Sequence, residues 1–230
     1  MLTSQALLLR AVAYGEADVM ATLFTQQQGL ITLAAKGARK SKRRYTCLEP
    51  LHTLSIAYDL RHGAEVGTLY DASVAVVRVG VSTSLAKLAV AGAALGWLHS
   101  VAKPHQPIPG AWTVANAFLD ALAAHGEAPN EACLDTWLAA YGIHLLVTVG
   151  LDPRFDSCCQ CDKVCPDSGA VTVDPAQGGV VCRNCGGGPI LLGGALRERI
   201  VATCEGVNAL VDGDAPAVVR LVKAMMRDHG

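Results

Sequence analysis

The sequence predicts an α+β protein of several parts: a small closed β-barrel, a set of helices, and a compact element built around four cysteines. Three observations support this prediction. Short segments of β-type composition, separated by turn residues, fill the first 79 residues. Beyond residue 80 the apolar residues recur at helical spacing. Two Cys-x2-Cys pairs then follow one another, Cys158 with Cys161 and Cys182 with Cys185.

Residues 1–79 predict the barrel, because each apolar segment there has the length of a strand and is bounded by Gly, Gln, Pro or charged residues. Five short strands with turns between them favour a small closed barrel over an open sheet. A long loop would join the third strand to the fourth. The expected strands are residues 6–14, 19–25, 30–35, 51–58 and 65–70.

Residues 80–150 predict a helical domain, since the apolar period changes to that of a helix. A run of hydroxyl residues, 82–84, is expected to cap the first helix at Leu85. Residues 191–230 predict two C-terminal helices that pack back on the central ones. The expected helices run from residue 85 past 95, then over 112–122, 131–149, 196–207 and 216–226.

Twenty residues separate the two cysteine pairs, and each pair can place two thiolates on one tight turn. Together, four sulfurs can surround a tetrahedral Zn²⁺ and leave no open position, so the metal would be structural. Residues 171–173 and 178–181 predict a short hairpin between the pairs, so that residues 151–190 form a four-cysteine zinc ribbon with one ion. Cys159 and Cys165 lie in the same stretch and stay open as alternative ligands.

Positive charge is concentrated in residues 36–44, which we call the basic segment. The whole chain has a formal net charge of −1, yet six of these nine residues are cationic and none is acidic. Since charges more than about 10 Å away are screened at cellular salt, a local cluster can bind a polyanion despite a neutral total. The cations of the segment are Lys36, Arg39, Lys40, Lys42, Arg43 and Arg44.

Other functional classes lack their sequence signals. No apolar run reaches the roughly 18 residues that a membrane span needs, so no membrane span is expected. The chain has no Gly-x4-Gly-Lys-Ser/Thr loop, no nucleophile–base constellation, and no histidine between residues 145 and 228 that could complete a deaminase-type zinc site. The odd total of nine cysteines favours a reducing cytosol over a disulfide framework. We therefore expect a cytoplasmic protein that is not an enzyme and has no small-molecule substrate.

Several short motifs resemble the bacterial RecO family in order and spacing. They are residues 14–18 (Tyr-Gly-Glu-Ala-Asp), 23–25, 29–31, 34–39, 150–153, the glycine pair 178–179, and both cysteine pairs. The resemblance implies an OB-fold for residues 1–79, binding of single- and double-stranded DNA, and annealing of complementary strands. It also implies loading of RecA, with RecR, onto strands covered by single-strand-binding protein, with RecF kept open as a further partner and a nucleoid-associated location.

On this resemblance the basic segment would contact DNA phosphates, with Arg10 as a further cation, while exposed aromatic rings would stack on bases. Tyr14, Tyr45 and Tyr58 are the candidates for stacking, whereas Phe24 is expected in the core. Two other functions stay open. One is a zinc-ribbon adaptor whose basic segment docks an acidic protein partner, and the other is an RNA-binding OB protein.

Overall fold

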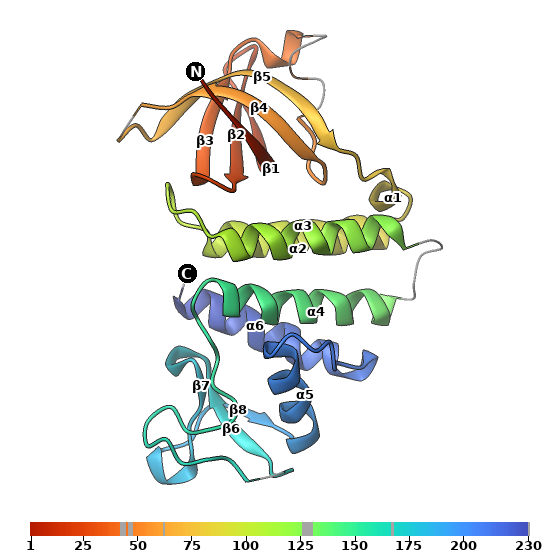
Figure 1. The fold of residues 1–230 in the computed structure, drawn as a ribbon. Coiled ribbons are helices and arrows are strands. Elements are labelled where there is room, and N and C mark those ends of the chain that lie inside the picture. Colours follow the sequence, from red (N-terminus) through yellow and green to blue (C-terminus); the bar gives the residue numbers. More distant parts are fainter. Residues whose placement is uncertain (42–44, 46–47, 62, 126–130, 167, 230) are drawn as a thin grey trace. The chain divides into compact units, whose positions relative to one another are not determined.

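The computed structural model describes the chain except residues 42–44, 46–47, 62, 126–130, 167 and 230, and for residues 131 and 229 it describes the backbone alone. Contacts divide the chain into two compact units, Met1–Ala128 and Pro129–Gly230 (Figure 1). The boundary between these units falls within residues 80–150, the range predicted as a helical domain. The finer division into four domains stays a prediction.

The first unit contains the predicted barrel. The strands are closed in the order β1-β2-β3-β5-β4, with β1 antiparallel to β4 and β3 parallel to β5. A five-stranded closed barrel of this kind is an OB-fold, so the predicted fold class is confirmed. The strands are β1 (Leu2–Tyr14), β2 (Asp18–Thr25), β3 (Gly29–Ala35), β4 (Thr53–Asp59) and β5 (Val66–Val76).

Two strands are longer than their composition predicts. β1 begins at Leu2 rather than at residue 6, because its first residues pair with β4, from Leu2 opposite Tyr58 onward. β5 continues past residue 70 to Val76, which lies opposite Thr53 of β4. Cross-strand hydrogen bonding, rather than local residue preference, sets both ends.

The barrel interior follows the two-residue period of its strands. Along β3, Ile31, Leu33 and Ala35 are buried, while the residues between them are partly exposed. Every strand contributes apolar side chains to one continuous core, as expected for a barrel small enough to be filled by its own side chains. The core residues are Ala6, Leu8, Ala21, Leu23, Ile31, Leu33, Ala35, Tyr45, Leu54, Ile56, Tyr58, Leu69 and Ala72.

The α-helices described in the first unit are α1 (Val79–Ser82), α2 (Leu85–Val101) and α3 (Pro109–Ala124). Ser84 occupies the N-cap position of α2, but its hydroxyl makes no capping hydrogen bond. The expected cap is therefore right in position and wrong in mechanism.

A buried arginine, Arg78, ties the barrel to α3 although it is only 2% exposed. Its Nη1 donates to Thr53 Oγ1 at 2.8 Å, its Nη2 to Asn116 Oδ1 at 2.9 Å, and its Nε to Asp120 Oδ1 at 2.7 Å. Since a buried guanidinium is costly without partners, these bonds fix how the end of the barrel meets the helix within this unit.

The second unit combines helices with a three-stranded sheet ordered β7-β6-β8. The predicted hairpin is present as β6 and β7, whereas β8 was not predicted, because three apolar residues between glycine-rich turns carry too weak a strand signal. α5 and α6 both pack against α4. The elements are α4 (Glu131–Thr148), β6 (Val171–Asp174), β7 (Gly179–Val180), β8 (Ile190–Leu192), α5 (Gly194–Cys204) and α6 (Ala215–His229). In the part of the chain that the structure describes, no helix combines the length and apolar character needed to cross a membrane.

An ion pair between half-buried Arg199 and buried Asp214 in the second unit predicts a pH dependence. The Arg199 guanidinium donates two hydrogen bonds of 2.6 Å to the carboxylate of Asp214, which lowers the pKa of that carboxyl below its usual value. A lowered pKa stabilises the fold above the ordinary value of about 3.9, and this contribution is lost as the pH falls through and below that value. We expect Asp214→Asn to lower the free energy of unfolding by about 1–3 kcal/mol at pH 7. Urea unfolding followed by circular dichroism should show the gap to the wild type closing below pH 4, and a gap that stays constant from pH 7 to 3 contradicts the assignment.

Candidate nucleic-acid interface and metal centre

The turn between β1 and β2 and the start of the basic segment form one hydrogen-bonded surface. Tyr14 ends β1 and lies opposite Asp18, the first residue of β2. The backbone N–H of Arg39 donates to Ala17 O at 2.9 Å, and the N–H of Gly37 donates to Asp18 Oδ1 at 2.8 Å. Residues far apart in sequence, the tip of the first hairpin and the loop after β3, are thereby joined at one end of the barrel.

The described cations of this surface face solvent. Lys36, Arg39 and Lys40 are all exposed, and the last two lie in a 3-10 turn, Ala38–Lys40. Arg39 Nη1 makes a long hydrogen bond of 3.4 Å to Glu16 O. Within the described ranges no carboxylate lies within 4 Å of these three cationic groups. The other predicted cations, Lys42, Arg43 and Arg44, lie outside the described residues.

Of the three tyrosines predicted to stack on bases, Tyr14 is well placed and the other two are not. Tyr14 is 63% exposed, whereas Tyr45 and Tyr58 are 6% and 2% exposed in the barrel core, where Tyr45 donates its hydroxyl hydrogen to Leu69 O at 2.8 Å. The prediction was wrong for both, because the barrel interior needs large side chains. Tyr58 lies two residues after Ile56 on the same face of β4, and this two-residue period in the sequence could have predicted that Tyr58 is buried. Phe24, fully buried, is in the core as predicted.

Arg10 lies on the same hairpin as Tyr14. A β-bulge between Leu8 and Arg10 shifts the pairing of β1 with β2, and Arg10 then lies opposite Thr22. From Arg10 to Tyr14 the register is regular, so residues four apart share one face of the strand. Arg10 is exposed, so its charge is on the same face as the tyrosine ring.

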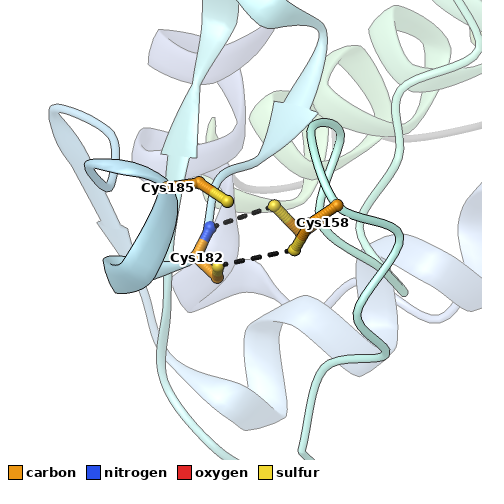
Figure 2. A group of neighbouring side chains, drawn as sticks. Cys158, Cys182 and Cys185 are labelled. Atoms are coloured by element: carbon orange, nitrogen blue, oxygen red, sulfur yellow. Dashed lines mark hydrogen bonds between the residues drawn. The ribbon is translucent and has the colours of Figure 1, made fainter.

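The four cysteines predicted as ligands are brought together in the second unit. The Sγ atoms of Cys158, Cys161, Cys182 and Cys185 all lie within 4.8 Å of one another. The sulfurs of Cys161 and Cys182 are 3.8 Å apart, which matches the edge of about 3.8 Å of a tetrahedron with Zn–S bonds of about 2.3 Å. In Figure 2 the sulfur-bearing side chains of Cys158, Cys182 and Cys185 converge on one point. Cys159 is not part of this cluster.

Two tight turns present the sulfurs. In the first, Asp162 N–H donates to Cys158 O at 3.0 Å, and in the second, Cys185 N–H donates to Cys182 O at 2.9 Å. Gly186 follows with φ of +103°, a conformation that favours glycine. The two turns lie next to each other, and a hydrogen bond of 3.3 Å from the backbone N–H of Cys182 to Cys158 Sγ joins them.

Two thiols of the cluster, Cys158 and Cys185, differ sharply in pKa. The hydrogen bond from the Cys182 backbone lowers the pKa of Cys158 to about 6. By contrast, hydrogen bonds with the sulfurs of Cys182 and Cys161 raise the pKa of Cys185 to about 12. Four thiolates within 4.8 Å of one another would repel, and a cation between them would offset that repulsion. A donor set of four converging sulfurs therefore fits Zn²⁺, which binds thiolates.

α5 supports the loop that carries the first pair. Arg197, 6% exposed, donates to Phe155 O at 3.3 Å and to Pro166 O at 2.8 Å, so it bridges both ends of that loop. Cys165 lies beside this arginine rather than in the cluster, and burial raises the pKa of its thiol. Sequence reasoning missed Arg197, since nothing in a charged helix marks which arginine is buried.

Gly179 of the glycine pair has a packing role. A Cβ atom at this position would lie 2.2 Å from Arg154 O, so no larger residue fits there without movement of the backbone. The neighbouring Val180 N–H donates to the same oxygen at 2.8 Å. This close approach brings β7 against the strand-like segment just before Cys158.

The chain combines an OB-fold barrel with helices and a four-cysteine ribbon. These features define its class as an OB-fold protein with a metal-binding type of ribbon. Residues 1–77 match the family model described as Recombination protein O N terminal. The chain is 34% identical over 223 residues to DNA repair protein RecO of Anaeromyxobacter sp. (strain Fw109-5), covering 96% of this chain and 84% of that protein. RecO of Myxococcus xanthus is 32% identical over 212 residues, covering 90% and 80%. The chain belongs to the RecO family of DNA repair proteins.

Proposed function

We propose that this RecO-family protein is a DNA-binding recombination mediator. It binds single- and double-stranded DNA, anneals complementary strands and, with RecR, helps to load RecA onto strands covered by single-strand-binding protein. The observation that carries the proposal is the surface at one end of the barrel, where hydrogen bonds join the β1–β2 turn, which follows exposed Tyr14, to the segment that carries the exposed cations. The protein acts in the cytoplasm at the nucleoid, and RecF is a further candidate partner.

The mechanism needs no catalytic residue. Lys36, Arg39 and Lys40, with Arg10 and the rest of the basic segment, neutralise phosphates and release condensed counterions, which supplies sequence-independent affinity. Tyr14 offers a ring on which a base of a single strand can stack. Because the contacts go to phosphates and to one base face, the Watson–Crick edges stay free. Two strands held by such surfaces repel each other less, and complementary bases can pair.

One structural Zn²⁺ would be held in the ribbon of the second unit by Cys158, Cys161, Cys182 and Cys185. When bound, the ion supplies four coordinate bonds that cross-link the two turns. The chain itself brings the four sulfurs together, and Arg197 supports the loop of the first cysteine pair by a hydrogen bond to Pro166 O. Four sulfur ligands leave no position for a substrate, so the ion stabilises the fold and takes no part in chemistry.

The first test is fluorescence anisotropy of a labelled single-stranded DNA oligonucleotide, titrated with the full chain at several salt concentrations. If three to five cations contact phosphates, log K should fall against log salt with a slope of roughly −2 to −3.5. Absence of binding at low salt contradicts the proposal and favours an adaptor that binds an acidic protein. An unlabelled RNA of the same sequence that competes better than the DNA favours an RNA-binding function instead.

A further inference from the structure

An acidic residue, Asp18, lies at the centre of the proposed DNA interface. It lies opposite Tyr14 across the first hairpin and is the first residue of β2, the strand that pairs with β3, next to the start of the basic segment. By charge alone this carboxylate should repel phosphates and weaken binding. Its Oδ1, however, accepts the backbone N–H of Gly37 at 2.8 Å, which suggests a different role.

Gly37 is the point at which the basic segment changes direction. Its φ is +68°, and a Cβ atom there would meet nothing within 4 Å, so packing does not impose this conformation. Glycine can adopt many backbone conformations at little steric cost, so a hydrogen bond is needed to hold Gly37 in one of them. The carbonyl of Gly37 accepts the N–H of Lys40 at 3.1 Å, and Arg39 N–H donates to Ala17 O at 2.9 Å. The direction of the cationic turn thus depends on how Gly37 is held.

We propose that Asp18 is a positioning residue for DNA binding. Its carboxylate oxygen holds Gly37 against the β1–β2 turn, so that Lys36, Arg39 and Lys40 stand beside the ring of Tyr14 as one surface. This inference rests on the proposed function and adds a residue whose charge has the wrong sign for a direct contact with DNA.

Separating the charge of Asp18 from its acceptor oxygen tests the role. Asp18→Asn removes the charge and keeps an acceptor oxygen, whereas Asp18→Ala removes both. Glu16→Ala is the matched charge control, because the described contact of Glu16 with the segment involves only its backbone oxygen. A residue that merely repels DNA would give tighter binding in all three variants. A positioning residue gives weaker binding in Asp18→Ala alone.

The experiment measures the anisotropy of labelled oligothymidylate with the full-length variants at fixed salt. We expect Asp18→Asn and Glu16→Ala to bind as tightly as the wild type or up to about twofold tighter, and Asp18→Ala to bind about three- to tenfold more weakly, the loss expected for one hydrogen bond. Affinity of Asp18→Ala equal to or above that of Asp18→Asn overturns the proposal.

A second pair of variants leaves Asp18 in place. Gly37→Ala meets no steric obstacle but is strained at a positive φ, so it should weaken DNA binding, whereas Gly37→Asn tolerates this conformation and should bind nearly as the wild type does. Equal affinity of these two variants also counts against the proposal.

Amide hydrogen exchange of Gly37 supplies a readout that does not need DNA. Protection of this N–H should be lost in Asp18→Ala and kept in Asp18→Asn, and protection unchanged in both variants overturns the positioning role. If the wild type binds with the expected salt slope while the Asp18 variants do not differ, only this inference fails. If the wild type does not bind DNA at all, the proposed function fails with it.

Discussion

Replacing Lys36, Arg39 and Lys40 together with glutamine is expected to weaken binding to single-stranded DNA at least about tenfold near 0.1 M salt. Glutamine keeps a long side chain that donates hydrogen bonds, so the change removes charge with little loss of shape. Each phosphate contact on a single strand contributes about 0.7 to the salt slope, so the slope should become shallower by about 2. Anisotropy titrations at several salt concentrations measure both quantities.

A control with the same change in net charge is needed, because total charge alone alters binding to a polyanion. Lys103, Lys163 and Lys223 are exposed and scattered outside the proposed interface. Their triple replacement with glutamine should change the affinity less than about threefold and leave the slope almost unchanged. If both triple variants lose affinity equally, DNA binds through diffuse charge, and the surface beside Tyr14 is not the interface.

Removing one sulfur of the cluster, in Cys182→Ser, should abolish zinc binding and destabilise the second unit. The Sγ of Cys182 lies 3.8 Å from that of Cys161, and its backbone N–H donates to Cys158 Sγ, so it contacts the other pair most directly. Because a structural zinc site supplies much of the folding free energy of its element, we expect zinc content to fall from about one ion per chain to near zero. The thermal unfolding midpoint of this unit should fall by at least about 10 °C.

Cys159→Ser is the matched control for the metal site. Cys159 is adjacent to a ligand in sequence and half-buried, but its sulfur is outside the cluster. Its serine variant should keep one zinc, measured by plasma mass spectrometry, and most of its thermal stability. Zinc loss in Cys159→Ser, or full stability without zinc in Cys182→Ser, contradicts the assigned ligand set. Removal of zinc with a chelator should give the same loss of stability as Cys182→Ser.

The metal site was largely predictable because its geometry is local. Two residues between the cysteines of each pair suffice for a tight turn, and the glycines after Cys185 allow the turn to close. Spacing alone left Cys159 and Cys165 open as ligands. Cys165 is excluded by its place beside Arg197 on α5, and that contact joins residues far apart in the chain.

The candidate DNA surface was predictable in part. The charge of the basic segment is visible in the sequence, and so is the turn that leaves Tyr14 exposed. That these two features share one surface depends on the hydrogen bonds of Asp18 and Ala17 with the segment, which no periodicity reveals. Tyr45 and Tyr58 were misjudged because exposure is decided by barrel closure rather than by residue type.

By itself, the sequence determined the properties that depend on near neighbours: the strand and helix segments, the turns at the cysteine pairs, and the concentration of charge in residues 36–44. Tertiary structure alone decided the strand ends, the third ribbon strand β8, the buried roles of Arg78 and Arg197, and the division of the helices between two units. The reason is physical. Local preferences act over a few residues, whereas burial and the pairing of polar groups are settled between segments that meet only when the chain has folded.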